Sequence, residues 1–403
     1  MTDGILDGVR ILEWGEFVSG PWTSRLLADM GADVIKIEQP GVGDSSRRAG
    51  PFPGDVPDDE KSGLFLYLNW NKRSVTLDLH HPESRNIFDK LVAQSDVLIE
   101  NHPPSQTRDL GISYESLKKI NPGLLMVSLS PFGQTGPYSD YAASELILFH
   151  AGGIGYETPI GEVTDRERQQ PLKGPGYQSY FMAGWIAALS TMVGLFHKQT
   201  NGVGQYIDIS EQEAIASTQR PNITRYSYAG EVYHREAMGG ARFKQCKDGY
   251  FAGFGALGND SMWQKLCAVI GNPEWTKKKI YENQASRREH ASEIDPKIAE
   301  WMMRYTKAEL FEMGQQGGLS CFPVNTVEDV YATEQYQYRG FFQEVAHPVA
   351  GTYAYPGIPF HFSSHQPGIR TRAPLLGEHT VIVLGELGFS DQEIVELRTK
   401  GII

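Results

Sequence analysis

Cysteine is scarce in this chain. Among 403 residues, Cys246, Cys267 and Cys321 are the only cysteines. They are scattered and odd in number, and none stands in a CxxC pair or near a histidine at metal-binding spacing. A disulfide framework and a cysteine-based metal site are therefore not expected. We interpret the three residues as small buried apolar side chains in a reducing compartment.

Signals for export or membrane insertion are also missing. The N-terminal segment has no basic stretch followed by an apolar run, and no apolar stretch approaches the roughly 20 residues that cross a bilayer. We therefore expect a cytoplasmic protein.

Positive charge is in deficit, because 37 Lys and Arg face 49 Asp and Glu, for a formal net charge of −12. Such a surface repels phosphate backbones and argues against a nucleic-acid partner. A local basic pocket for an anionic ligand remains compatible with it.

Glycine-rich phosphate loops and metal-ligand sets are absent from the sequence as well. There is no Walker-type loop, and the glycine pairs at residues 152–153 and 239–240 lack the strand–glycine–helix setting of a dinucleotide site. His80 and His81 have no third ligand close by in the sequence, so we expect no bound metal.

What the first part of the chain does contain is an alternation of strand and helix patterns. Short apolar or alternating runs predict strands, and amphipathic spacing between them predicts helices. The expected strands cover residues 9–12, 33–38, 73–79, 96–99 and 124–129, and the first expected helices cover residues 21–30 and 82–94. This alternation favours a mostly parallel sheet with right-handed crossovers.

Later segments differ from the first part in composition and hydrophobic pattern. Residues 40–62 are polar and rich in Gly and Pro, which predicts an exposed loop able to lie over a ligand. Residues 181–199 predict a long apolar helix whose small residues suit close packing. Residues 240–320 combine an expected strand pair at 243–254 with charged helices, as in a separate small domain. The alternation of strand and helix patterns returns from Phe322.

Two polar clusters leave their role open. Residues 69–74 include Lys72 and Arg73 and precede a strand, so this turn could meet phosphates, although composition alone is weak evidence. Glu211 and Glu213 form a carboxylate pair, which we interpret as the solvated start of a helix.

Motifs along the whole chain carry a resemblance to a known family. The matching segments are residues 6–12, 20–21, 26–38, 40–44, 71–79, 96–101, 132–138, 202–210, 323–325, 339–340, 356–359 and 373–379. In order and content these segments resemble the class III CoA-transferase family, which includes formyl-CoA and carnitine CoA-transferases.

The resemblance implies an α/β fold with a Rossmann-like large domain formed by both chain ends, a small α+β domain between them, and an interlocked dimer. For this chain it implies a large CoA-binding domain at residues 1–205 and 321–403, a linker at 206–235 and a small domain at 236–320. It implies no permanently bound cofactor, because CoA and acyl-CoA are substrates.

The family's nucleophile is missing here. An aspartate in an Asp-x-x-Ala-Gly pattern attacks the acyl-CoA and later carries CoA as a thioester, because an acylated carboxylate stays electrophilic. The pattern reads Tyr-Phe-Met-Ala-Gly at residues 180–184, and no Asp or Glu lies between Glu167 and Asp208. Glu145 stands where the family keeps a second carboxylate near the thioester. The resemblance thus points to Tyr180 and Glu145 as the residues at the catalytic position.

The resemblance also assigns the contacts to CoA. These positions are Phe17, Val18, Gln39, Lys72, Leu77, His80, Asn101, His102 and Arg108. Gln39 and His80 replace basic residues of the family pattern, and the order of Arg108 and Asp109 is reversed. Fewer cations weaken charge-assisted contacts with phosphate, so we expect CoA to bind more weakly than in relatives that keep them.

Three hypotheses for the function follow. In the first, the chain is the non-nucleophilic subunit of a heteromeric CoA-transferase that moves CoA between an acyl-CoA, such as succinyl-CoA, and a carboxylic acid, and a paralogous subunit supplies the aspartate. In the second, the chain forms a standalone enzyme, a CoA-ester hydrolase or lyase that uses Glu145 or Tyr180. In the third, it is a CoA-ester-binding protein without catalysis.

Overall fold

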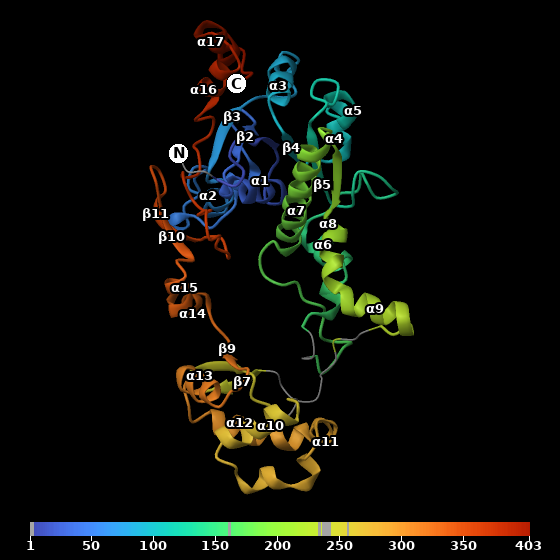
Figure 1. Cartoon of the computed structure of the whole chain (residues 1–403), viewed down its shortest axis with the longest axis vertical. Helices are drawn as coiled ribbons and strands as arrows, with labels where there is room; N and C mark the ends of the chain where they lie inside the picture. Colours follow the sequence, from blue (N-terminus) through green and yellow to red (C-terminus); the bar gives the residue numbers. More distant parts are fainter. Residues whose placement is uncertain (1–3, 160–162, 233–234, 236–242, 256–257) are drawn as a thin grey trace. The chain divides into compact units, whose positions relative to one another are not determined.

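The computed structural model describes residues 4–159, 163–232, 235, 243–255 and 258–403 (Figure 1). These residues form two compact units. The larger unit comprises Met1–Gly155, Lys173–Val232 and Arg339–Ile403, and the smaller unit comprises Tyr156–Leu172 and Tyr233–Tyr338. Both chain ends therefore belong to the larger unit, as the resemblance implied.

The larger unit is built on a six-stranded parallel sheet with the order β3-β2-β1-β4-β5-β6. Its strands are β1 (Arg10–Trp14), β2 (Asp33–Glu38), β3 (Lys72–Thr76), β4 (Val97–Glu100), β5 (Leu125–Ser130) and β6 (Tyr206–Ser210). The predicted parallel sheet is confirmed. This order places a topological switch point between β1 and β4, where ligands bind in open α/β sheets.

The other elements of the larger unit are mainly helices. They are α1 (Ser19–Asp29), η1 (Ser45–Arg48), η2 (Pro53–Asp55), α2 (Gly63–Asn69), α3 (Ser84–Ala93), α4 (Pro104–Asp109), α5 (Tyr114–Leu117), α6 (Glu145–Ala151), α7 (Gln178–Asn201), α8 (Glu211–Ala216), η4 (Ser217–Gln219), α9 (Arg220–Ala229), β10 (Phe342–His347), β11 (Gly351–Pro356), α16 (Thr380–Glu386) and α17 (Asp391–Thr399); η3 (Ile154–Glu157) spans the division between the units. Strands β10 and β11 form an antiparallel hairpin.

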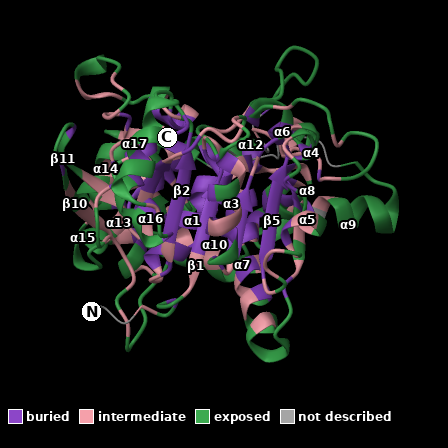
Figure 2. Cartoon of the chain, turned by 90° about the horizontal axis from the view of Figure 1, so that it is seen from above, coloured by how far each residue is buried: buried purple, intermediate pink, exposed green. Residues whose placement is uncertain are grey.

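Helices cover both faces of the sheet, and its inner strands β1, β2, β4 and β5 are buried (Figure 2). On one face, α1 and α7 pack against apolar side chains such as Val34, Val97 and Val127. On the other face, α3, α16 and α17 pack against alternating residues such as Ile35 and Leu98. The C-terminal helices thus complete the core that the N-terminal strands begin.

The expected domain limits and the compact units divide the chain at different residues. Residues 206–232, expected as a linker, lie in the larger unit, where β6 pairs with β5 at the sheet edge. Residues 321–338, expected in the larger domain, group with the smaller unit.

Helix α7 confirms the predicted long apolar helix, and its small residues explain its close packing. Ala183, Gly184 and Ala187 are buried, and a Cβ on Gly184 would lie 2.7 Å from Cδ1 of Trp22 in α1. By length and composition α7 could cross a membrane, with 33% of its most apolar window buried. The expectation that no apolar stretch reaches this length was therefore wrong, although core helices of soluble proteins have the same property.

The smaller unit has a three-stranded antiparallel sheet, β7-β8-β9, and a helical core. Its elements are β7 (Phe243–Cys246), β8 (Gly249–Ala252), α10 (Asp260–Val269), η5 (Glu274–Lys277), η6 (Lys279–Tyr281), α11 (Gln284–Glu289), α12 (Ala291–Met302), α13 (Lys307–Gln316), β9 (Phe322–Pro323), α14 (Val327–Ala332) and α15 (Glu334–Tyr338). Its core contains Cys246, Cys267 and Cys321, which are free and buried as predicted.

Candidate functional site

The loops that follow β1, β2, β3 and β4 meet at the carboxyl edge of the sheet, beside the switch point. They enclose a cavity of about 270 Å³, which we call the carboxyl-edge cavity. It is lined by Trp14, Gly15, Glu16, Ile37, Glu38, Gln39, Val42, Gly43, Asp44, Arg48, Leu77, Leu79, His80, His102 and Gln106. The first part of the expected loop at 40–62 thus forms one wall, at the position where α/β sheets bind ligands.

The structure brings together four of the residues expected to contact CoA, since Gln39, Leu77, His80 and His102 all line this cavity. They come from the ends of three strands that are far apart in the sequence. Their role in CoA binding stays a prediction.

The remaining expected contacts lie outside the lining and make other interactions. Asn101 holds the loop after β1, because its Oδ1 accepts from the Glu16 amide and its Nδ2 donates to the Glu16 carbonyl, both at 2.8 Å. Val18 is fully buried. The exposed Arg108 is paired with Asp140 at 2.7 Å.

Lys72 is buried beneath the site. Its Nζ lies 2.8 Å from the carboxylate of Glu13, from the carbonyl oxygen of Pro21 and from Oδ1 of Asn69. An ammonium group has three hydrogens, and these three partners account for all of them. In this structure Lys72 therefore supports the fold, and residues 69–74 do not present it to a ligand.

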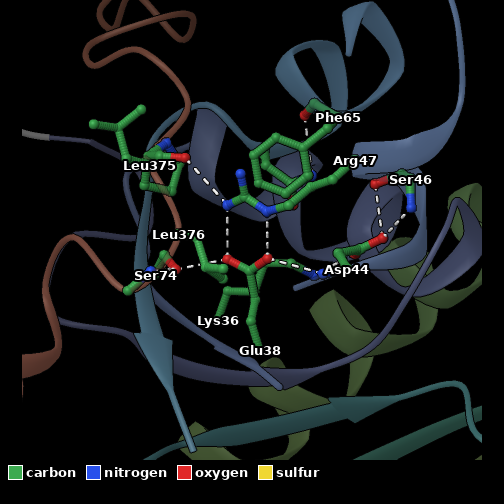
Figure 3. Close-up of polar contacts among 12 residues, drawn as sticks. Lys36, Glu38, Asp44, Ser46, Arg47, Phe65, Ser74, Leu375 and Leu376 are labelled. Atoms are coloured by element: carbon green, nitrogen blue, oxygen red, sulfur yellow. Dashed lines mark hydrogen bonds and ion pairs between the residues drawn. The ribbon is translucent and has the colours of Figure 1, made fainter. Parts of the chain in front are cut away.

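A buried ion network holds the wall of the carboxyl-edge cavity (Figure 3). Arg47 binds Glu38 in a two-pronged pair, with Nε to Oε2 at 2.7 Å and Nη2 to Oε1 at 2.9 Å. Glu38 also accepts from the Ser74 hydroxyl at 2.6 Å and from the Asp44 amide at 3.0 Å. Such bidentate, charge-assisted bonds are strong and geometrically specific, so they fix residues 39–48 against β2 and β3.

The same network extends below the cavity through Lys36. Its Nζ lies 2.6 Å from Glu13 and 2.7 Å from Asp44. Burial alone would raise the pKa values of both carboxyl groups, but the neighbouring lysines hold them below their usual range. Both acids are therefore charged and paired at neutral pH.

Few side chains in the cavity lining can carry positive charge. His102 stacks on Trp14 with ring centroids 3.9 Å apart, and burial together with the Lys36 charge lowers its pKa to about 4, so it is neutral at physiological pH. The exposed Arg48 and His80 remain as cationic candidates. Among the residues that the structure describes, no group of His, Cys, Asp and Glu is arranged to hold a metal ion.

Glu145 and Tyr180 meet at the start of α7. The Glu145 carboxylate accepts from the amide of Ser179 at 3.1 Å and from the amide of Tyr180 at 3.4 Å, and lies 3.4 Å from Lys173. A carboxylate satisfies the free N–H groups at a helix start and interacts favourably with the helix dipole. Glu145 therefore caps the helix that carries Tyr180.

Tyr180 is half-buried among aromatic side chains. Its ring centroid lies 6.0 Å from that of Phe17 and 6.5 Å from that of Tyr177. Burial, and then the charges of Glu211 and Glu145, raise the pKa of its hydroxyl far above the usual value. Tyr180 is thus a protonated phenol at physiological pH.

Glu211 is a member of this site that sequence reasoning missed. The expectation of a solvated pair was wrong for Glu211, which is only 3% exposed, while Glu213 is exposed. Burial raises its pKa to about 7, a hydrogen bond with the Ser19 side chain opposes this effect, and the Glu145 charge adds to it. Its position directly after β6, at the carboxyl edge of a parallel sheet, is the signal that could have revealed it.

Comparisons with known proteins agree along the whole chain. The model of CoA-transferase family III matches residues 6–380. The chain is 31% identical to the succinyl-CoA--L-malate CoA-transferase beta subunit of Chloroflexus aurantiacus, over 99% of this chain and 98% of that protein. It is also 31% identical to a formyl-CoA:oxalate CoA-transferase of Rhodopseudomonas palustris, over 99% and 97%. A crystal structure of a CaiB/BaiF family protein from Brucella suis is similar with a TM-score of 0.83 and 28% identity, over 96% of this chain and 100% of that one.

Proposed function

The chain belongs to CoA-transferase family III, and we propose that it acts in the cytoplasm as the non-nucleophilic subunit of a heteromeric CoA-transferase. In this proposal a paralogous partner interlocks with the chain and supplies the aspartate. The pair moves CoA between an acyl-CoA, such as succinyl-CoA, and a carboxylic acid.

One observation carries the proposal: the carboxylate beside Tyr180, the residue that the resemblance aligns with the family nucleophile, already caps a helix. Transfer requires an enzyme carbonyl carbon that first forms an anhydride with the acyl group and then a thioester with CoA. The Tyr180 hydroxyl has no such carbon, and its raised pKa keeps it a phenol. Both oxygens of Glu145 accept from the Ser179 amide at the start of the helix, so its carboxylate is held in place.

Two further observations support the proposal. Four of the residues that the resemblance assigns to CoA contacts line the carboxyl-edge cavity, which supports a role in substrate binding without a nucleophile. One relative is named as a beta subunit, which fits an assembly in which different chains have different tasks.

The test is a trapping experiment on three samples: this chain alone, an Asp-bearing paralogue alone, and their mixture. Each is incubated with succinyl-CoA, a carboxylic acid acceptor and hydroxylamine, which derivatises enzyme thioesters. We expect transfer activity in the mixture, a trapped residue on the paralogue, and no adduct on this chain by mass spectrometry.

Each rival has its own outcome in the same experiment. A turnover-dependent adduct on Glu145, or cleavage of the CoA ester by the isolated chain, would establish a standalone enzyme that uses Glu145 or Tyr180. CoA-ester binding without activity in any sample, with every tested paralogue, would leave a binding protein.

A further inference from the structure

A second cavity lies at the opposite edge of the sheet, beside the amino ends of β2 and β3. It has a volume of about 690 Å³, and we call it the amino-edge cavity. Charged or titratable residues line it, from β2, from β3 and from the C-terminal segment that precedes α16: Asp33, Lys72, Arg73, Arg370, Arg372, Glu378 and His379. The ammonium group of Lys72 is already paired with Glu13. None of these residues lines the carboxyl-edge cavity.

Two of the three arginines in the lining are neutralised by carboxylates. Arg73 lies 2.6 Å from Asp33 and 2.8 Å from Glu386. Arg372 lies 2.6 Å from Glu378. These pairs hold the walls in place and leave little charge for a ligand.

Arg370 is different, because its fixed contacts are to uncharged groups. Its backbone N–H donates to Oδ1 of Asn71 at 2.7 Å, and its Nη2 donates to the carbonyl of Ala28 at 2.7 Å. Within the described ranges of the chain, no carboxylate pairs with its guanidinium group. A Cβ on Gly31 would lie 3.4 Å from its Nη1, so the guanidinium group is seated directly over a glycine.

The local charge balance is therefore positive in a chain whose net charge is −12. Arg10 also pairs with Asp33, at 3.2 Å. Four arginines, at 10, 73, 370 and 372, thus face three carboxylates, at 33, 378 and 386, which leaves the charge of Arg370 uncompensated. Burial lowers the pKa of His379; the Glu378 charge opposes this effect, and the charges of Arg73 and Arg372 add to it. His379 therefore contributes a neutral ring rather than a further charge.

We propose that the amino-edge cavity binds a phosphate group, either as inorganic phosphate or as a phosphate ester, with Arg370 as its charged anchor. Guanidinium groups form strong charge-assisted bonds with phosphate oxygens. The tetrahedral oxygens of phosphate can accept from donors on several walls, whereas the two oxygens of a carboxylate lie in one plane. This site goes beyond the proposed function, because it uses neither the carboxyl-edge cavity nor the start of α7.

The test measures binding of inorganic phosphate to the full chain by isothermal titration calorimetry. We expect saturable binding. In Arg370→Gln the dissociation constant should rise about tenfold, as for the loss of a charge-assisted hydrogen bond. Arg370→Lys should retain most of the affinity, and Arg304→Gln, an exposed arginine of the smaller unit, should match the unchanged protein.

A parallel titration with glucose 6-phosphate distinguishes a phosphate ester from the free ion, since the tighter ligand identifies the source. Amide hydrogen exchange of the unchanged protein gives a reading that requires no variant: phosphate should protect the backbone amides of residues 370–372 and leave those of residues 39–48 unchanged. The inference is overturned by no saturable binding up to about 10 mM phosphate, by equal affinity in Arg370→Gln, or by tighter binding of succinate than of phosphate.

Discussion

Two groups of buried carboxylates in the larger unit are stabilised in different ways. In the network below the carboxyl-edge cavity, Glu13, Glu38 and Asp44 each lie within ion-pair distance of a lysine or arginine. At the start of α7, the Glu145 carboxylate accepts from helix amides and lies 3.4 Å from Lys173. Glu211 makes a hydrogen bond with the Ser19 side chain. The neighbouring lysines hold the pKa values of Glu13 and Asp44 below their usual range, whereas burial raises the pKa of Glu211 to about 7.

This difference matters for the proposed function. A network whose carboxylates are paired with cations can hold residues 39–48 in one geometry for a ligand. The site around Tyr180 is only partly charge-compensated, and it is there that a partner subunit would complete the chemistry. Four substitutions test the contrast, beginning with the largest expected effect.

Arg47→Ala removes the cation that pairs with Glu38 in the network. It leaves the buried Glu38 carboxylate without its two-pronged partner, and breaking a buried ion pair in this way costs roughly 3–5 kcal/mol. We expect the free energy of unfolding, measured by urea denaturation, to fall by that amount. Arg304→Gln, which removes an exposed pair, should change little. A loss below about 1 kcal/mol in Arg47→Ala would show that the network is not the support inferred here.

Glu211→Gln tests the acid that has no cation partner. Because the folded-state pKa is raised to about 7, the folded chain keeps a proton on Glu211 that the unfolded chain releases near pH 4.5. Stability from this group is thus fully present below about pH 4.5 and declines as pH rises to about 7, at up to about 1.4 kcal/mol per pH unit. Urea denaturation at several pH values should show Glu211→Gln gaining stability relative to the unchanged chain over this window.

Glu213→Gln is the matched control for that experiment, since Glu213 is exposed on the same helix. Its pH dependence should follow that of the unchanged chain. If Glu211→Gln and Glu213→Gln have the same pH profile, Glu211 is charged in the folded state and the contrast between the two sites disappears.

Glu145→Ala tests the helix cap. It leaves the amides of Ser179 and Tyr180 without their acceptor, and the loss of a cap costs roughly 1–2 kcal/mol. Thermal or urea unfolding should show a decrease of this size, and Glu145→Gln, which keeps an acceptor oxygen, should show a smaller one. If Glu145→Ala and the unchanged chain are equally stable, Glu145 does not stabilise the helix as a cap, and its carboxylate is available for a chemical role.

The sheet and the family could be predicted from the sequence, because strand periodicity and ordered motifs are local features of the chain. The environments of Lys72 and Glu211 could not. Lys72 ends inside the fold because Glu13 and Pro21, from another strand and a helix, meet it there. Glu211 is buried because the start of α8 lies close to Ser19, and a carboxylate pair at a helix start looks the same in sequence whether it faces solvent or the core.

Arg48→Gln gives the smallest effect and separates two neighbouring arginines. The side chain of Arg47 points into the network, while Arg48 is exposed and lines the carboxyl-edge cavity. Exposed charge contacts are weak and screened by salt, so we expect CoA to bind about three- to fivefold more weakly to Arg48→Gln, with a shallower dependence of affinity on salt. The urea midpoint should not move, because Nη1 of Arg48 contacts only the carbonyl of Val42 among the described residues. Calorimetry with CoA at low and high salt measures both quantities. If CoA affinity and its salt dependence are the same in Arg48→Gln and Arg304→Gln, the phosphates of CoA do not meet this wall, and the matched network below it supports the fold alone.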